Sequence, residues 1–346
     1  MREKTALTPD QVGKRRRLGL RIGAFTGTAI LLVVLTLVST TVGSLNVSLG
    51  ELVHGLASGG DEAVRTVMDV RLPRIIIALF AGAALAVSGT LLQAVMKNPL
   101  TDPGIIGISS ASALVGSLVT AIFPSLFFGV PLLSILGGLF AYLAIYSLAW
   151  DGGVHPTRLI LVGVALNMTF TGIGQAVTAA FGGGVNMTGT QSIVSGHIAQ
   201  KTWDDVRLLV IYVGITLVVA LFSARVCNLL ALDDKTARGL GIAVDRNRFW
   251  VALIAIILAA ITSSTVGIVG FLGLLVPHIA RLLVGSDHKV LIPYAILLGA
   301  LFMLASDTIG RAIFYPYEVP AAVIMAVVGG PFFIALLKIG GQTDEY

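Results

Sequence analysis

The sequence contains few charged residues and a single cysteine. Asp, Glu, Lys and Arg make up 12% of the 346 residues, whereas soluble domains carry about 25%. One cysteine, Cys227, excludes a disulfide framework and a multi-cysteine metal site. Hydrophobic residues reach 56%, and the mean hydropathy is +0.93. These values predict an integral membrane protein rather than a soluble domain.

Motifs for several activities are also missing from the sequence. It contains no Gly-Lys-Ser or Gly-Lys-Thr, so it has no Walker A motif and cannot be its own P-loop ATPase. It contains no His-Glu-x-x-His, and its five histidines form no cluster with the spacing of metal ligands. We therefore expect no intramembrane enzyme, no metal site and no cofactor bound by this chain.

Long apolar runs, in contrast, are abundant. A spanning helix needs ~20 mostly apolar residues. Ten segments approach this pattern and predict an all-α membrane protein with about ten transmembrane helices. They are residues 18–42, 74–96, 104–123, 131–150, 158–181, 206–227, 249–267, 268–285, 291–310 and 320–338. The third and the eighth contain several glycines and carry the weakest signals.

The basic residues indicate an orientation in the membrane. Residues 14–17, Lys-Arg-Arg-Arg, precede the first apolar run without an obvious cleavage site, so we expect an uncleaved first helix. With the N-terminus inside, most of the 23 lysines and arginines fall on the cytoplasmic side, as do both chain ends. The net charge of +5 is small for this length. The basic cluster is therefore expected to set orientation, not to bind nucleic acid.

The expected organisation is a cytoplasmic N-terminus (1–17), a ten-helix transmembrane domain (18–338) and a cytoplasmic tail (339–346). The longest inner loop, 227–248, can hold two short helices. Leucines give the first an apolar face, and Asp233 is a good N-cap for the second. Exposed leucines on a cytosolic loop indicate docking to another protein, and a lid packed on the membrane surface is the alternative.

Three arginines fall on the outer side, against the general bias. Arg71 and Arg74 bracket Pro73 at the start of a span, and Arg311 lies at the end of the ninth. Interfacial snorkelling would explain any one of them. Three at one face favour a receiving site for an acidic partner. Asp307, four residues before Arg311, is expected to form an internal pair with it, and a proton relay is the alternative.

Several long motifs resemble the FecCD family. They are RLPR (71–74), GAALAVSGTLLQAVMKNPLTDPGIIGISSASA (82–113), LALDDKTARGLG (230–241), GIVGFLGLLVPHIARLLVGSDHKVLIP (267–293) and ASDTIGRAIFYPYEVPAAVIMAVVGGPFFIALL (305–337). Together these motifs cover nearly the whole chain after residue 65, and they occur in the order found in the family. The match is therefore specific. Family members are permeases of ATP-driven importers for iron–siderophores, haem and cobalamin. The resemblance implies a cobalamin-importer-permease-like fold that pairs as a dimer in the bacterial cytoplasmic membrane.

The resemblance also implies partners. Two cytosolic ATPase subunits would use ATP and Mg, a second permease subunit would complete the path, and an extracytoplasmic binding protein would deliver the ligand. Arg71, Arg74 and Arg311 match the pockets that receive acidic residues of that protein. Arginine suits this role because its planar fork binds carboxylates bidentately.

A further match concerns the segment that contacts the ATPase. The residues expected to make this contact are Leu232, Asp233, Asp234, Ala237, Arg238, Leu240 and Gly241. The family usually has Gly where this chain has Asp233, which can still cap the following helix. It usually has Arg where this chain has Lys97, so the charge is retained.

The fifth span is implied to lie beside the translocation path. Asn167 and Thr169 are expected to line the path, with Gln93 as a further candidate, although helix–helix hydrogen bonding explains these residues equally well. The leading hypothesis is a permease subunit importing a ferric siderophore, with haem or cobalamin as alternatives. An ion-coupled secondary transporter would leave the 227–248 loop unexplained. An identical or a related partner permease, and a free or lipid-anchored binding protein, remain open alternatives.

Overall fold

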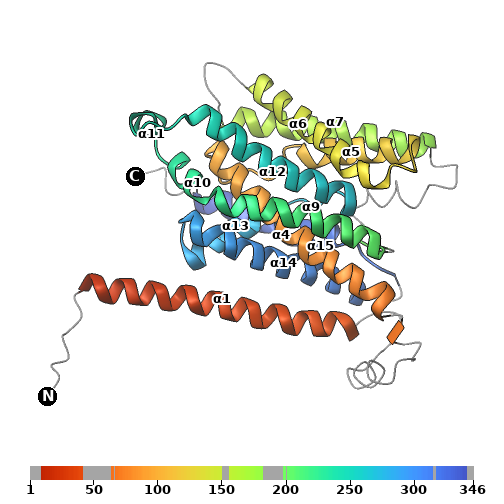
Figure 1. The fold of residues 1–346 in the computed structure, drawn as a ribbon, viewed down its shortest axis with the longest axis horizontal. Helices are drawn as coiled ribbons and strands as arrows, with labels where there is room; N and C mark the ends of the chain where they lie inside the picture. The colour runs from red at the N-terminus through yellow and green to blue at the C-terminus, as the bar shows by residue number, and fades with distance from the viewer. Residues whose placement is uncertain are drawn as a thin grey trace.

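The computed structural model describes residues 9–41, 64–65, 67–149, 156–181, 198–199, 201–314 and 317–340. Within these ranges the regular structure is helical, and Figure 1 shows the helices packed along one common direction. The outer parts of the two predicted cytoplasmic ends, 1–8 and 341–346, lie outside the described residues.

The helices follow the predicted apolar runs. They are α1 (Pro9–Thr41), η1 (Val67–Arg71), α4 (Leu72–Met96), α5 (Ile108–Ile122), η2 (Phe127–Gly129), α6 (Val130–Ala149), α7 (Pro156–Phe181), α9 (Trp203–Phe222), α10 (Ala224–Leu230), α11 (Asp234–Gly239), α12 (Val244–Val266), α13 (Leu272–Val284), α14 (His288–Ala312) and α15 (Ala321–Gly340). Among the described residues, seven helices are long and apolar enough to cross a membrane, and three apolar helices are shorter. The predicted all-α membrane fold is confirmed.

The two weakest predicted spans are shorter than expected. Helix α5 begins at Ile108 instead of residue 104, and α13 begins at Leu272 instead of residue 268. Gly267 and Phe271, which flank the link between α12 and α13, have φ values of 83° and 66°. These angles lie outside the right-handed helical region, so α12 cannot continue into α13. At 1.5 Å per residue, α13 is about 20 Å long, shorter than a ~30 Å hydrocarbon core.

Helix α4 forms the centre of the bundle. It packs against α14, α12, α13 and α9, and most of its side chains are buried. Helices α5, α6 and α7 lie together on one side, and α1 lies on the opposite side against α14 (Figure 1). Gly82 of α4 faces Gly299 of α14, and a Cβ on either glycine would overlap the carbonyl oxygen of the other. The two helix backbones therefore touch at this crossing.

The ends of α4 carry two of the sequence features singled out above. Its first turn contains Pro73, which lacks the N–H that a helix start leaves unpaired. Its C-cap is Lys97, which adopts a left-handed conformation (φ 49°) and donates its backbone N–H to the carbonyl of Gln93. Helices α4 and α14 each have 25 residues, which corresponds to about 37 Å. Both therefore connect one end of the bundle to the other.

Candidate functional site

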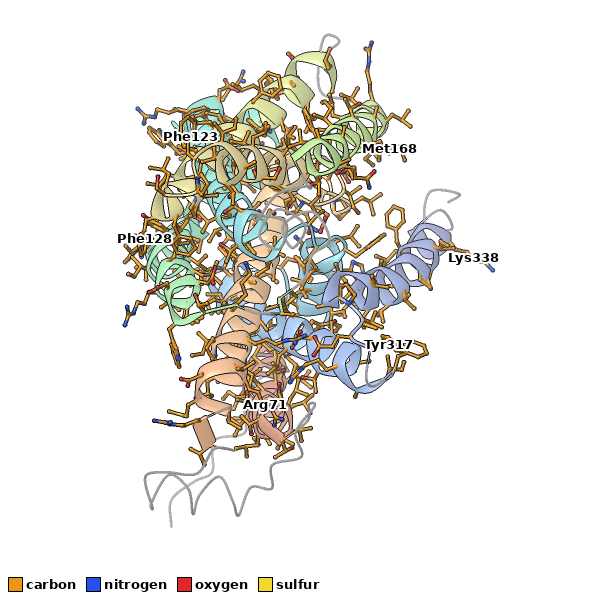
Figure 2. All side chains as sticks on the ribbon, turned by 90° about the vertical axis from the view of Figure 1, so that its right-hand side faces the viewer. Arg71, Phe123, Phe128, Met168, Tyr317 and Lys338 are labelled. Carbon is orange, nitrogen blue, oxygen red and sulfur yellow. The ribbon has the colours of Figure 1, made fainter. Side chains whose placement is uncertain are left out.

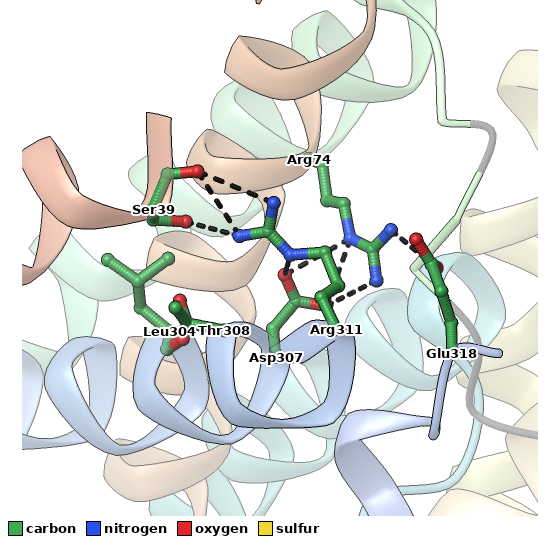
Figure 3. A network of polar contacts seen from close by, with 7 residues as sticks. All are labelled: Ser39, Arg74, Leu304, Asp307, Thr308, Arg311 and Glu318. Carbon is green, nitrogen blue, oxygen red and sulfur yellow. Dashed lines mark hydrogen bonds and ion pairs between the residues drawn. The ribbon is translucent and has the colours of Figure 1, made fainter. Parts of the chain in front are cut away.

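The three predicted arginines meet where α4 begins and α14 ends. Figure 2 looks onto this end of the molecule with Arg71 labelled, and Figure 3 shows the contacts of Arg74 and Arg311. Two acids join them, Asp307 from α14 and Glu318 from the link to α15. We call these five residues the arginine cluster.

Asp307 is the centre of this cluster. Its Oδ1 lies 3.0 Å from Nε and 2.9 Å from Nη2 of Arg74, and its Oδ2 lies 3.2 Å from Nε of Arg311. The contact with Arg311 is an ion pair rather than an aligned hydrogen bond. The expected Asp307–Arg311 pair is confirmed. Its sharing with Arg74 makes Asp307 a counter-ion between α4 and α14.

The arginines also hold the end of α1. Arg311 donates to the carbonyl and hydroxyl oxygens of Ser39, and Arg71 donates through Nη1 to the carbonyl of Thr40 at 2.6 Å. All three guanidinium side chains belong to buried residues, between 5% and 8% exposed. The sequence placed these arginines on the outer side of the membrane, and the structure shows that their side chains are buried and join α1, α4 and α14. Their docking role stays a prediction.

The second candidate site is the coupling segment, residues 231–243, at the opposite end of α4. The two short helices expected in the loop 227–248 are α10, which begins earlier at Ala224 and ends just before this segment, and α11, which lies within it. The predicted sixth span, 206–227, therefore ends early, at Phe222 of α9. Asp233 caps α11 by accepting the backbone N–H of Lys235 at 3.1 Å, and Gly241 follows the helix with φ 80°. The local capping signals in the sequence therefore predicted this segment correctly.

Two basic residues attach the coupling segment to the bundle. Asp234 Oδ1 accepts from Lys97 Nζ at 2.7 Å and from Arg248 Nη2 at 2.8 Å. Lys97 also donates to the carbonyl oxygen of Leu232. The hydrogen bond from Lys97, followed by that from Arg248, lowers the pKa of the Asp234 carboxyl. The sequence showed that position 97 is basic, as in the family, but it gave no indication that Lys97 contacts Asp234 and Leu232.

The side chains of the coupling segment fall into two groups. Leu232 and Leu240 are 38% and 62% exposed, whereas Ala237 is fully buried. Arg238 forms an exposed ion pair with Asp245 at 3.3 Å. The segment therefore offers leucines for an external contact and uses Ala237 for internal packing.

The predicted path residues lie in different environments. Gln93 is buried, and its amide accepts from Arg281 at 2.6 Å and donates to the carbonyls of Thr101 and Gly273. Helix–helix hydrogen bonding, the alternative expected for Gln93, describes these contacts. Asn167 is half-buried and Thr169 is exposed on α7. Within the part of the chain that the structure describes, no three His, Cys, Asp or Glu side chains could hold a metal ion.

A family model described as the FecCD transport family matches residues 31–338. The chain belongs to this family. Membership identifies the FecCD protein as the permease component of an ABC importer, a multi-pass transport subunit and not an enzyme. It is 39% identical over 308 residues to the "Probable heme-iron transport system permease protein IsdF" of Staphylococcus aureus strains MSSA476 and MW2, covering 89% of this chain and 93% of each relative.

Solved structures agree with this assignment. The FecCD chain is 29% identical to an inward-facing structure assigned to the metal-chelate type of ABC transporter, with a TM-score of 0.75 over 92% of this chain and 99% of that one. PsaBC from Streptococcus pneumoniae, solved with a Fab, shares the fold at 17% identity, with a TM-score of 0.55 over 83% of this chain and 95% of that one.

Proposed function

We propose that this FecCD permease carries an iron chelate across the bacterial cytoplasmic membrane, and that the chelate is haem. The observation that carries the proposal is the 39% identity, over most of both chains, to permeases named for heme-iron transport. A ferric siderophore, the substrate expected from the sequence, is the second candidate within the same chemical class. Cobalamin is the third.

Two sites at opposite ends of α4 support the binding of different partner proteins at the two ends of the permease. The coupling segment would receive the cytosolic ATPase subunits, which use ATP and Mg, through the exposed Leu232 and Leu240. The arginine cluster would receive carboxylates of the extracytoplasmic binding protein, since complementary charge speeds encounter and fixes register. Figure 1 places the start of α1 at the same end as α10 and α11, in keeping with a cytoplasmic N-terminus.

A second permease subunit, identical or homologous, would complete the translocation path. Helix α7 supports this part of the proposal because few of its residues are fully buried in the single subunit, unlike those of α4. Asn167 and Thr169 lie on this helix and are proposed to face the path. A path for a bulky chelate needs only weak, nonspecific contacts between its lining residues and the ligand. The binding protein would therefore select the ligand.

Uptake by whole cells tests the substrate. Cells expressing the permease, the ATPase and the binding protein are supplied with iron-55 as haem and as a panel of ferric siderophores, and separately with labelled cobalamin. We expect accumulation of haem iron that depends on all three proteins. Accumulation of a siderophore or of cobalamin in place of haem would overturn the haem proposal and identify the substrate.

A further inference from the structure

The Arg74 guanidinium divides its donors between two carboxylates that differ in exposure. Its Nε and Nη2 bind Asp307, whereas its Nη1 binds Glu318 Oε2 at 2.8 Å. The Asp307 side chain is 1% exposed and the Glu318 side chain is 38% exposed. Figure 3 shows the two acids on different sides of the guanidinium. The Nε and Nη2 donors of Arg74 therefore bind a buried acid, whereas its Nη1 donor binds an acid that solvent can reach.

The two acids are also held with different strength. Asp307 lies within α14 and forms ion pairs with Arg74 and Arg311. Among the described residues, the Glu318 carboxylate has one partner, Arg74. Its backbone is fixed, because the next residue, Val319, donates its N–H to the carbonyl of Gly310 at 2.9 Å. Rotation of the Glu318 side chain alone is thus sufficient to free Nη1 of Arg74.

We propose that Glu318 is a resident acid that occupies Arg74 in the free permease and exchanges with a carboxylate of the extracytoplasmic binding protein on docking. The inference rests on the proposed function of the arginine cluster as the docking site. The exchange replaces one N–H···O bond to Arg74 with another of the same kind. Arg74 Nη1 therefore has a carboxylate partner both before and after docking, so neither state has the cost of an unpaired buried donor.

The exchange has a consequence for affinity. The incoming carboxylate has to compete with Glu318, so the permease weakens its own docking interaction. A partly exposed ion pair is weak, so this competition lowers the affinity without preventing docking. The competition favours dissociation of the binding protein, as repeated delivery cycles require. Asp307 cannot take this part because its removal would leave two buried arginines without their shared counter-ion.

The affinity of the binding protein for the permease–ATPase complex in lipid nanodiscs tests the proposal. The probe is the binding protein of the same transport system, and the variants are Glu318→Gln and Glu318→Ala. We expect both to bind about three- to tenfold more tightly than the wild type, mainly through slower dissociation. The Gln variant keeps an oxygen that can accept a hydrogen bond from Arg74, so we expect it to fold even if the Ala variant does not.

Asp204→Asn is the matched control, because Asp204 is an exposed acid paired with Arg207 at 3.3 Å outside the cluster. It changes the net charge equally and is expected to leave the affinity unchanged. Unchanged or weaker binding of both Glu318 variants would overturn the exchange, and so would equal tightening by Asp204→Asn. Arg71→Gln in the same series tests docking itself: unaltered affinity there would overturn the docking site, whatever the Glu318 variants show.

Discussion

At the scale of single residues, Asp307 has the most consequential contacts of the arginine cluster. It pairs with Arg74 of α4 and with Arg311, and Arg311 in turn binds Ser39 of α1. The carboxylate therefore joins α14 to α4, and it neutralises the arginine that binds α1. Removing one partner of a buried ion pair leaves the other charge uncompensated.

Asp307→Asn is expected to destabilise the permease by about 3–5 kcal/mol, the usual cost of breaking a buried ion pair. Thermal unfolding of the purified protein in detergent measures the effect. Asp204→Asn serves as the control, because an exposed ion pair contributes at most about 1 kcal/mol. An Asp307→Asn protein that melts with the wild type would contradict the role of this carboxylate.

The sequence predicted part of this network. Asp307 and Arg311 are four residues apart on one helix, so their pairing follows from helix geometry. Arg74 and Glu318 are 244 positions apart, and the sequence contains no local signal that connects them. For the same reason the sequence did not show that the arginines are buried, because charge type is visible in a sequence and the partner that permits burial is not.

At the scale of helices, α4 and α14 are in contact at two levels of the bundle. They touch at Gly82 and Gly299 near the middle and are joined by Arg74 and Asp307 at one end. A close backbone approach gives van der Waals packing that larger residues would prevent. We infer that the pair moves as a rigid body.

Gly82→Ala is expected to force α4 and α14 apart and to destabilise the permease by about 1–3 kcal/mol, as overpacking does. Gly214→Ala in α9 is the matched control, because its added Cβ would meet no atom within 4 Å. Thermal unfolding compares the two variants. Equal stability of Gly82→Ala and Gly214→Ala would show that the crossing is not tightly packed.

Lys97 connects this helix pair to the coupling segment. Lys97→Ala removes its bonds to Asp234 and to the Leu232 carbonyl, so amide hydrogen exchange in residues 231–243 should become faster. Lys97→Arg keeps the charge and should preserve the protection. If Lys97→Ala exchanges as slowly as the wild type, Arg248 alone holds the segment and Lys97 is not needed.

Most helix bounds were predictable to within a few residues because hydropathy and capping signals are local. Helix α1 departs most, since it begins at Pro9 instead of residue 18. Helices α5 and α13 begin late because the chain before them adopts turns that hydropathy does not reveal. Gly267 and Phe271 have left-handed φ values, and hydropathy does not distinguish such a link from a helix. Asp233, in contrast, was recognised as an N-cap from its sequence position alone.

At the scale of the whole molecule, the arginine cluster and the coupling segment lie at opposite ends of α4 and α14. The family and the all-α membrane fold followed from the sequence, because long motifs and apolar runs specify them. The identity of the transported ligand did not follow from the sequence, since residues that line a path through weak contacts form no recognisable motif. The contacts that join α4 to α14 and to the coupling segment became visible only in the structure.

Leu240→Asp is expected to detach the ATPase, since it places a charge on the most exposed leucine of the coupling segment. Leu240→Met keeps an apolar side chain and should retain binding. Co-purification of the ATPase with a tagged permease measures both variants. Full retention by the Asp variant would mean that the ATPase binds elsewhere.

We propose that ATP hydrolysis in a partner subunit drives the transport of an iron chelate through this chain. The most direct measurement is uptake of iron-55 haem into proteoliposomes containing the permease and its ATPase, with the binding protein outside and Mg-ATP inside. We expect accumulation with the active ATPase and none with a hydrolysis-deficient ATPase. Accumulation that persists with the inactive ATPase would contradict the proposal and indicate secondary transport.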